Sequence, residues 1–407
     1  MSAGKEQAMS ALPVATPDAE RLAKPVNIRV ALIFLFLGNI VIGSGVLAPA
    51  AMINAMTADL RVTPVAIGAL IGWGAVILCI GAPAFGFFTN RIDRRTLLAA
   101  SLLLYAAGHA ASVFAADYAT LMVIRLAMIS GAAIFTPQAA GAVTLMVPEA
   151  RRAGAVAFVF MGWAVATAVV IPFMSILGEA LNWRSIYAGI AIAALLSAIG
   201  VQLLMPAKLY PSRMSLRSWG DVLTRPAILI LLAVTSLQIT GQFTLYPYLA
   251  AELRRVSLAD SSGVALALGL SGAAGLIGSI LAARLVSSVG AARMHLICLS
   301  AMAAGLIGWS IFSGMLTFAL ASVFIWGLGF GAGISMQQAR LISVAPALAS
   351  ASVALNTSVL YLGQASGTAI GGSLISSNLH GFMSIAGVAF ILAAIAASWW
   401  AWRRYGS

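Results

Sequence analysis

The sequence predicts an all-α membrane protein with 12 transmembrane helices, arranged as two pseudo-symmetric six-helix bundles. The first observation is composition: the 407 residues are 61% hydrophobic and only 8% charged, and the mean hydropathy is +1.01. Such values are typical of chains that cross a membrane many times. The second observation is a series of apolar segments long enough to span a bilayer. The third is a partial repeat of the first half of the sequence in the second half.

The apolar segments follow a polar stretch, residues 1–27, which we expect to be a cytoplasmic tail. The first apolar segment begins too late and runs too long for a cleavable signal peptide. Windows of about 19 residues predict twelve spans along the chain. The predicted spans are 29–52, 64–88, 96–115, 118–141, 153–178, 184–205, 226–250, 262–286, 291–313, 315–339, 349–376 and 382–402.

The longest polar break lies between the sixth and seventh spans and divides the chain into two halves. We therefore predict a tail at 1–27, a first bundle at 28–205, a linker at 206–225, a second bundle at 226–402 and a tail at 403–407. A shift of 198 residues aligns Pro49 with Pro247, Leu60 with Leu258, Gly74 with Gly272 and Arg95 with Arg293. Two similar bundles of parallel topology are typical of secondary transporters, whose substrate site lies between the bundles near the middle of the membrane.

The basic residues are distributed unequally between the two sides of the predicted membrane. The formal net charge is +12, and 18 of the 23 Lys and Arg fall on the side that carries both termini. Four fall on the opposite side, and Arg125 lies within a span. The positive-inside rule places both termini in the cytoplasm. Topology thus explains the basic character, and we expect no nucleic-acid partner.

No motif in the sequence indicates enzyme activity or a bound cofactor. Zinc-protease, nucleophile-elbow and phosphate-loop patterns are absent. Cys79 and Cys298 lie in separate apolar segments, without the spacing of a metal site or a disulfide. The glycine-rich stretch 327–333 lies inside a span, so we expect Gly329 and Gly333 to permit close helix packing or bending.

The ten residues GFFTNRIDRR (86–95), between the second and third spans, identify a resemblance. They resemble the signature of the major facilitator superfamily at this loop, roughly G-x-x-x-D-R-x-G-R-R. LMVIRLAMISGAAIF (121–135) and GWAVATAVVIPFMSILG (162–178), which contains Pro172, resemble the family's fourth-span and fifth-span motifs. ALNWRSIY, TGQFTLYPYLA and GQASGTAIGG are similar to the bacterial drug:proton antiporters and the sugar, purine and amphenicol exporters. The resemblance implies the major facilitator fold, a monomer in a bacterial inner membrane, and a hinge or packing role for Pro172.

The resemblance also implies that the 86–95 loop is a conformational latch. Its arginines would bridge to the opposite bundle and hold the state that is closed toward the cytoplasm, while the glycine lets two helix ends approach. The sequence departs from the pattern at two positions, where the family usually has Asp and Gly. The alternative is that the arginines only anchor the topology. The predicted latch residues are Gly86, Asn90, Arg91, Asp93, Arg94 and Arg95.

A charged residue inside a span usually marks function. Arg125 follows Tyr118 by seven residues, which is about 10 Å into the helix. It either organises charge at the binding site or bonds to neighbouring carbonyl groups in a structural role. None of the eleven carboxylates falls clearly within a span, and His109 is the one histidine that we assign to a span. His109 is therefore a candidate proton carrier, with a packed structural histidine as the alternative.

A polar face follows the seventh span, because Gln238, Gln242 and Tyr246 repeat every four residues. Trp326, Gly333 and Gln337 share a face of the tenth span, and Asn39 lies in the first. The resemblance implies a cavity lined by the first, fourth, seventh and tenth spans. These residues and Arg125 therefore predict a site for a neutral or anionic polar ligand; hydrogen bonds between helices are the alternative.

We thus expect proton-coupled efflux of a small amphipathic or polar molecule by alternating access, with the lipid bilayer, the substrate and protons as partners. The missing carboxylate favours an alternative, an uncoupled facilitator or importer of a neutral or anionic metabolite. A transporter-like receptor that binds its ligand without flux is the third possibility.

Overall fold

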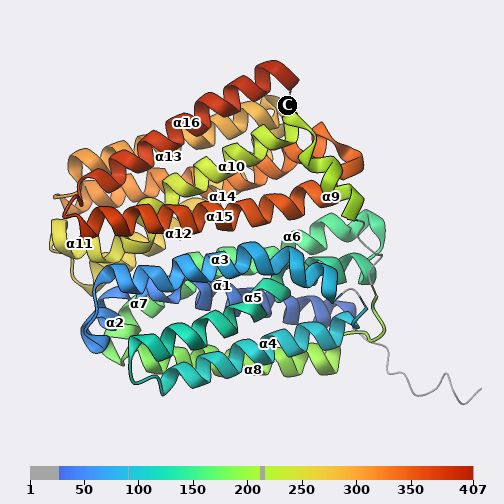
Figure 1. The fold of residues 1–407 in the computed structure, drawn as a ribbon, viewed down its shortest axis with the longest axis horizontal. Helices are drawn as coiled ribbons and strands as arrows, with labels where there is room; N and C mark the ends of the chain where they lie inside the picture. The colour runs from blue at the N-terminus through green and yellow to red at the C-terminus, as the bar shows by residue number, and fades with distance from the viewer. Residues whose placement is uncertain (1–26, 90, 211–215, 407) are drawn as a thin grey trace, which may run out of the picture.

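The structure is a computed structural model that describes residues 27–89, 91–210 and 216–406. Within these ranges the regular structure is entirely helical, and the long helices lie roughly side by side (Figure 1). The first half of the chain contains α1 (Ile28–Ala51), α2 (Ile53–Leu60), α3 (Pro64–Phe88), α4 (Arg94–Val113), α5 (Tyr118–Met146), α6 (Glu149–Val165), the π-helical turn η1 (Ala166–Val170), α7 (Ile171–Ala180) and α8 (Trp183–Leu204).

The second half, after the short helix α9, again has a long helix followed by a short one and then further long helices. It contains α9 (Leu216–Leu223), α10 (Pro226–Leu245), the 3-10 turns η2 (Tyr246–Tyr248) and η3 (Pro346–Leu348), α11 (Leu249–Ser257), α12 (Ser261–Val289), α13 (Ala291–Phe312), α14 (Leu316–Val344), α15 (Ala349–Ser376) and α16 (Phe382–Tyr405). Each predicted span overlaps one long helix or one run of consecutive helices. In the fifth span, α6, η1 and α7 are continuous; in the seventh, α10, η2 and α11 are.

Eleven of these helical segments, within the described residues, are long and apolar enough to cross a membrane. The segment at the eleventh predicted span, α15, is 28 residues long but is not among them. Its sequence is rich in Ser and Gly and includes Asn356 and Gln364, both of which are buried. Its polar residues therefore face other helices rather than lipid.

Polar caps fix where several helices begin. Thr63 precedes Pro64 and accepts a hydrogen bond from the backbone N–H of Ala66 at 3.3 Å. Asp117 caps α5 through the N–H of Thr120, and Asp260 caps α12 through the N–H of Gly263, both at 2.8 Å. These side chains satisfy N–H groups that have no partner within the helix.

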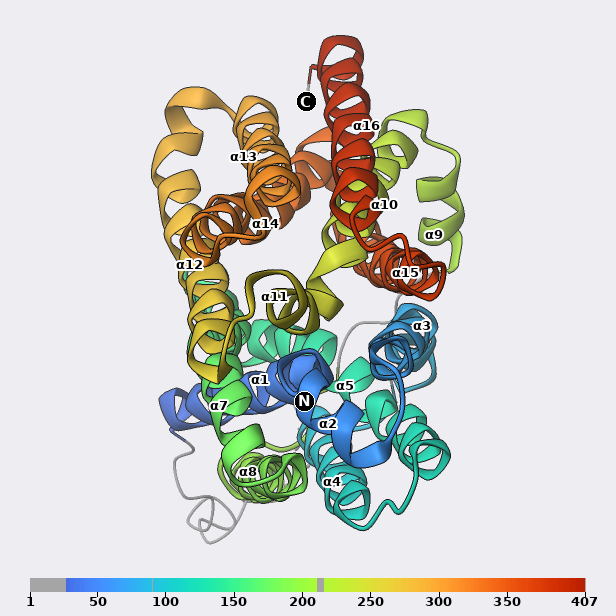
Figure 2. The ribbon, with the colours of Figure 1, turned by 90° about the vertical axis from the view of Figure 1, so that its left-hand side faces the viewer.

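The two halves form two bundles, α1–α8 and α9–α16, which lie one below the other in Figure 2. They meet where α3 packs against α15 and where η1 and α7 pack against α12. The second contact is close, because a Cβ placed on Gly272 of α12 would lie 2.4 Å from the Cα atom of Ala168 in η1. Only a glycine lets the backbones approach to this distance.

The internal repeat has a structural counterpart at the first long helix of each half. Pro49 lies inside α1 and Pro247 lies in η2, and a short helix, α2 or α11, follows each. Both short helices end in a left-handed residue, Arg61 and Leu258, each with φ of 53°. We call the end of the molecule that carries α2 and α11 the α2/α11 side. The opposite end, where α1 begins and α16 ends, is the termini side (Figure 1).

Candidate functional site

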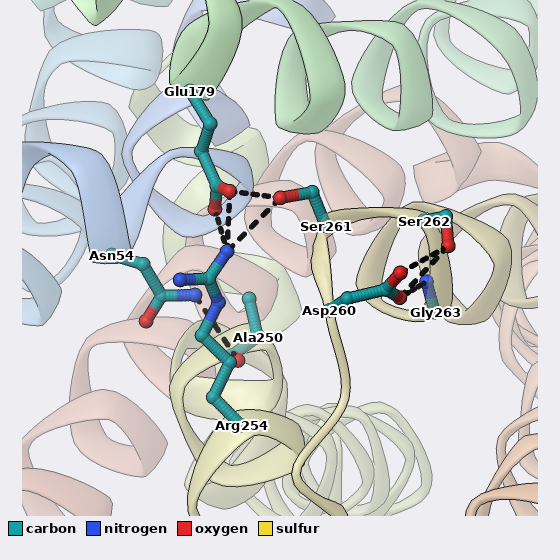
Figure 3. A network of polar contacts seen from close by, with 8 residues as sticks. All are labelled: Asn54, Glu179, Ala250, Arg254, Asp260, Ser261, Ser262 and Gly263. Atoms are coloured by element: carbon teal, nitrogen blue, oxygen red, sulfur yellow. Dashed lines mark hydrogen bonds and ion pairs between the residues drawn. The ribbon is translucent and has the colours of Figure 1, made fainter.

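Polar contacts join the two bundles at the α2/α11 side (Figure 3). Arg254 of α11 forms an ion pair with Glu179 of α7, and the Ser261 hydroxyl donates to the same carboxylate. Close by, the Asn54 side chain of α2 donates to the carbonyl oxygen of Ala250 at 3.3 Å. We call these contacts, made by Asn54, Glu179, Ala250, Arg254 and Ser261, the bundle bridge.

An aromatic contact closes the same side. Tyr248 of η2 lies against Gly68 of α3 in the other bundle, where a Cβ on Gly68 would be 2.3 Å from the ring. The hydroxyl of Tyr248 donates to the carbonyl oxygen of Thr368 in α15 at 2.9 Å. The ring fits between the bundles because Gly68 has no side chain.

The four ion pairs between described side chains all lie at the α2/α11 side. Besides Arg254–Glu179 they are Arg184–Asp59, within the first bundle, and Arg255–Glu252 and His380–Glu252, within the second. The bundle bridge is thus the one charged connection between the bundles among these residues. It combines groups from α7 and α11 that lie 75 positions apart in sequence.

The predicted latch lies at the termini side and contacts the linker. The backbone N–H of Arg94 donates to the carbonyl oxygen of Leu209 at 3.0 Å, and Asp93 accepts from the N–H of Leu209 at 2.9 Å. The Arg94 guanidinium donates to the carbonyl oxygen of Thr89 at 3.1 Å. In the described part of the loop, the two bonds with Leu209 thus connect the loop to the linker, and the bond to Thr89 stays within the loop.

The remaining latch residues have different environments. Arg91 is exposed and Arg95 is half-buried, while a Cβ on Gly86 would lie 3.5 Å from the Gln138 side chain of α5. This is an ordinary van der Waals distance to a side chain, so the close approach of two helices at Gly86 stays a prediction. Asn90 lies outside the described residues. The latch function stays a prediction.

Arg125 is buried in the first bundle, and its guanidinium donates to three backbone carbonyl groups. It donates to Leu70 of α3 at 2.8 Å and to Gly45 and Val46 of α1 at 3.2 and 2.7 Å. These carbonyl groups lie where α1 and α3 pass α5. The geometry therefore favours the structural alternative, in which Arg125 fastens three helices together.

His109 of α4 is also enclosed in the first bundle. Its Nδ1 lies 3.0 Å from the carbonyl oxygen of Tyr105, so this nitrogen must carry the proton. The rings of Tyr105 and Tyr187 lie 4.4 and 5.1 Å from the imidazole. Its Nε2 has no hydrogen-bond partner among the described residues. The surroundings are those of a neutral histidine packed among aromatic side chains.

Asn39 of α1 belongs to a second polar cluster of this bundle. Its side chain accepts from the hydroxyl of Thr136 at 2.9 Å and donates to the carbonyl oxygen of Leu35 at 3.4 Å. The indole of Trp163 also reaches the Thr136 hydroxyl, at 3.5 Å. Asn39 thus links α1 to α5 and α6.

The second bundle contains a buried polar network that the sequence did not predict. His295 Nε2 lies 3.0 Å from Gln238 Oε1, and His295 Nδ1 lies 3.2 Å from both Ser398 Oγ and Arg340 Nη1. Arg340 also donates to Ser398 Oγ at 2.7 Å and to Gln337 Oε1 at 3.3 Å. We call Gln238, His295, Gln337, Arg340 and Ser398 the His295 network; it joins α10, α13, α14 and α16.

This network corrects two expectations. His109 is not the one histidine inside a span, because His295 already falls in the predicted span 291–313 and α13 buries it completely. Arg340, counted with the loop residues, lies inside α14 because this helix continues to Val344. The predicted span stops at residue 339, which makes Arg340 a loop residue, and only the length of α14 shows that it is enclosed.

The predicted polar face of the seventh span divides between two environments. Gln238 enters the His295 network, whereas Tyr246 packs against Trp326 of α14, with ring centroids 6.1 Å apart and nearly perpendicular. Phe243 lies 5.7 Å from Tyr246. Gln242 Oε1 and Trp326 Nε1, both buried, have no hydrogen-bond partner among the described residues. We call Gln242, Phe243, Tyr246 and Trp326 the aromatic cluster; it offers one free acceptor and one free donor.

The predicted hinge and packing residues lie at tight contacts. A Cβ on Gly329 would be 2.1 Å from the carbonyl oxygen of Cys298, and one on Gly333 would be 2.6 Å from Gln238 Nε2. Pro172 follows the π-helical turn and lies opposite Gly269 of α12, whose Cβ would be 3.4 Å from the proline ring. Gly329 and Gly333 therefore permit close packing of α14 on α13 and α10.

Sequence reasoning missed Glu179, Arg254, His295, Arg340 and Ser398. Glu179 and Arg254 carry opposite charges at span ends on the same predicted side of the membrane. That signal was visible, but it does not select one partner among several. Nothing in the sequence brings His295 and Arg340 together, because they lie 45 positions apart.

Comparison with known proteins agrees with this architecture. The sequence model of the Major Facilitator Superfamily matches residues 33–368. The chain is 28% identical over 366 residues to the inner membrane transport protein YdhP of Escherichia coli strain K12, a match that covers 89% of this chain and 93% of YdhP.

Two solved structures share the fold. A D-xylose-proton symporter superimposes with a TM-score of 0.72 at 17% identity, covering 93% of this chain and 98% of the symporter. A bacterial homologue of the human lysosomal transporter Spinster, in an inward-facing and unoccupied conformation, gives 0.69 at 16% identity, covering 94% and 98%. The predicted all-α fold of two helical bundles is confirmed.

Proposed function

Since the chain belongs to the Major Facilitator Superfamily and is a multi-pass secondary transporter, we propose that it exports a small amphipathic or polar molecule in exchange for protons. It would do so by rocking one bundle against the other around a central site. The single observation that carries this proposal is the bundle bridge, a small set of polar contacts that joins the bundles at the α2/α11 side.

Alternating access requires connections between the bundles that can break and reform. The Arg254 and Glu179 side chains are 37% and 21% exposed, so water can solvate both charges when the pair separates. Partly exposed ion pairs contribute only about 0.2–1 kcal/mol, so their loss is compatible with a reversible opening. The bundle bridge can therefore act as a gate that opens and closes the α2/α11 side.

The distribution of charge supports an orientation for this gate. Lys and Arg are concentrated at the termini side, which we assign to the cytoplasm by the positive-inside rule. The α2/α11 side is then the outer side, and the structure corresponds to an inward-facing state. YdhP is named an inner membrane transport protein, which supports the same membrane for this chain.

The aromatic cluster is the site that we assign to the substrate. Gln242 Oε1 can accept a hydrogen bond and Trp326 Nε1 can donate one, while Phe243 and Tyr246 supply apolar surface. A ligand with an aromatic or apolar body and both a donor and an acceptor would satisfy these groups. The site contains no charged side chain, and Arg125 is occupied by three carbonyl groups.

An uncoupled facilitator or importer is the second candidate. It is favoured by the carboxylates of the described residues, which lie outside the spans or at their ends. Many proton-coupled transporters use a carboxylate or a histidine inside the membrane, so this protein would need a different group.

Binding and flux experiments test the proposal in sequence. A panel of amphenicols, nucleobases, sugars, organic anions and lipophilic cations is first tested for thermal stabilisation of the purified protein. The compound that stabilises most is then loaded into proteoliposomes with or without an imposed pH gradient. We expect the gradient to drive accumulation; equal rates with and without it would favour the uncoupled facilitator, and binding without any flux would favour a receptor.

A further inference from the structure

The hydrogen bonds around His295 define its protonation state. Gln238 Oε1 is an acceptor, so His295 Nε2, 3.0 Å away, must carry a hydrogen. A guanidinium can only donate, so His295 Nδ1, 3.2 Å from Arg340 Nη1, must present its lone pair. This assignment requires the Gln238 amide orientation that the structure has. The imidazole is therefore neutral in this conformation.

A proton at Nδ1 is unfavourable in this arrangement. It would place a second cation 3.2 Å from Arg340, and the one neighbouring acceptor among the described contacts of Nδ1, the Ser398 hydroxyl at 3.2 Å, already accepts from Arg340 at 2.7 Å. Separation of Arg340 from His295 relieves this repulsion. The conformation described here thus binds the proton weakly, and a conformation that separates the two side chains binds it more tightly.

The charges near His295 do not change this conclusion. Among the helices that pack against α13, α14 presents Arg340, and α16 presents the neutral Ser398. The charged residue of α12, Arg284, is exposed, and α10 has no charged residue between Pro226 and Leu245. On α13 itself, Arg293 is exposed and lies over Trp402, 5.2 Å from its ring centroid. Cys298, one turn further along α13, is a buried neutral thiol.

The network also lies near a route to water. A cavity of about 330 Å³ at the α2/α11 side is remote from it, but one of about 530 Å³ opens at the termini side. The larger cavity is lined by Arg225, Ser343 and Tyr405, among others. Ser343 lies one turn from Arg340 on α14, and its hydroxyl donates to the Arg340 carbonyl oxygen at 2.8 Å. Arg340 therefore lies one helical turn from a residue that lines this cavity.

From these contacts we propose that His295 is the group that binds the coupling proton of this transporter, and that Arg340 displaces the proton in the state described here. The inference rests on the proton coupling proposed above. A proton from water binds Nδ1 in the state open at the α2/α11 side. It leaves to water at the termini side when Arg340 returns to Nδ1, and no other bond is made or broken.

The network connects this event to the substrate site. Gln337 of α14 donates to the carbonyl oxygen of Leu231 in α10 at 2.5 Å and accepts from Arg340 at 3.3 Å. The same two helices carry Gln242 and Trp326 of the aromatic cluster. Movement of Arg340 would therefore change how α10 and α14 pack at the aromatic cluster, where the substrate is proposed to bind. Because the two states differ in affinity for the proton, acid must shift the population toward the state that binds it.

Nuclear magnetic resonance of the whole protein in lipid nanodiscs measures the protonation directly. The chain has three histidines, so the ¹⁵N imidazole signals can be assigned with the single variants H109Q and H380Q, which leave His295 in place. We expect the His295 signals to be those of the Nε2–H tautomer at high pH and to change to those of imidazolium as pH falls from about 8 to 5. A neutral His295 throughout this range overturns the proposal.

Distance measurements test the link to conformation. Nitroxide labels at positions 114 and 258 report on the α2/α11 side, because Phe114 and Leu258 are 84% and 87% exposed there, in a chain whose Cys79 and Cys298 are replaced by alanine. Acid should increase the fraction with a long distance, and H295Q should abolish this change. H109Q and H380Q should retain it; loss of the change in H380Q instead would assign the proton to the Glu252–His380 pair and overturn the proposal.

The two proposals fail in different ways. If a pH gradient does not drive flux through the wild-type protein, proton coupling itself is wrong, whatever His295 does. If the gradient drives flux but His295 does not titrate, or H295Q keeps gradient-driven flux, only the assignment to His295 is wrong. If H295Q does not fold, the titration of the wild-type His295 signals still shows whether His295 binds the proton.

Discussion

Tyr248 of the second bundle occupies space that a side chain on Gly68 of the first bundle would need: a Cβ there would lie 2.3 Å from the tyrosine ring. The hydroxyl of Tyr248 is held by the carbonyl oxygen of Thr368, so the ring cannot withdraw without losing this bond. Closure at the α2/α11 side therefore depends on a position without a side chain.

The variant G68V should shift the protein away from this closed state. The added side chain overlaps the Tyr248 ring and destabilises closure, while both bundles keep their own packing. The label pair at positions 114 and 258 should report a larger long-distance fraction than in the wild type. G189V is the matched control, because a Cβ on Gly189 meets no atom within 4 Å; an equal shift in both variants would argue against the Tyr248 contact.

Removing either charge of the bundle bridge should weaken the closed state, and exchanging the two charges should restore it. E179Q or R254Q alone removes the ion pair, and the expected loss of closed-state stability is about 0.2–1 kcal/mol, which is up to about a five-fold change in the equilibrium. The double variant E179R/R254E restores opposite charges and should return the distance distribution toward that of the wild type. Failure of the exchange to rescue either single variant would mean that the pair does not control the gate.

Arg125 should matter for folding as well as for transport. R125A removes three hydrogen bonds to carbonyl groups of α1 and α3. It leaves the Gly45 carbonyl without a donor, because the residue four positions on is Pro49, and one unsatisfied buried group costs about 1–3 kcal/mol. We expect a lower melting temperature and poor yield of R125A, with partial recovery in R125K. R284A provides the control, because Arg284 is exposed. A fully stable R125A that fails only in transport would instead support a direct role at the substrate site.

The substrate site should be separable from the fold. W326F removes the indole N–H but keeps an aromatic ring, and the N–H has no partner among the described residues. Because Trp326 is fully buried, the smaller ring leaves a cavity, and the melting temperature of the protein without ligand should fall somewhat; the ligand effect is therefore read as the shift above each variant's own ligand-free value. Stabilisation by the best compound of the panel should weaken by an amount equal to one hydrogen bond, about 0.5–1.5 kcal/mol, or about 2- to 13-fold in affinity. Unchanged stabilisation in both W326F and Q242L would place the ligand elsewhere.

The Asp59 contact should make the α2/α11 side sensitive to strong acid. Burial raises the pKa of the Asp59 carboxyl, but hydrogen bonds from Arg184 and Trp183 and the charge of Arg184 lower it below the ordinary value of 3.8. A lowered pKa in the folded state means that the carboxylate stabilises the fold above pH 3.8 and loses this effect as pH falls through the lowered pKa. Between pH 6 and pH 3 the melting temperature should fall less in D59N than in the wild type. An equal fall in both proteins would show that Asp59 does not cause the acid sensitivity.

The sequence predicted the helices well because the membrane imposes simple rules. A bilayer requires about 20 apolar residues for each crossing and backbone groups paired within each helix, so spans can be read from local composition. The predicted span 64–88 and the helix Pro64–Phe88 have the same limits. The predicted span 315–339 ended five residues before the helix, and that difference placed Arg340 outside the membrane.

The candidate site was predicted only in part, for a physical reason. The i, i+4 spacing singled out Gln238 and Gln242 of α10 and Tyr246 of η2, and all three are buried. It could not tell which of them would find a partner, because that depends on α13, α14 and α16. Gln238 meets His295, whereas Gln242 Oε1 meets no partner among the described residues.

By itself the sequence determined the membrane class, the positions of the helices and the family, since these follow from local composition and from motifs of neighbouring residues. The tertiary structure decided which polar groups pair: Arg125 with carbonyl groups, Arg254 with Glu179, and His295 with Arg340. Such pairs form between helices that are distant in the chain, and hydrogen-bond geometry within a few tenths of an ångström decides whether a buried polar side chain fastens helices, moves a proton or remains free for a ligand.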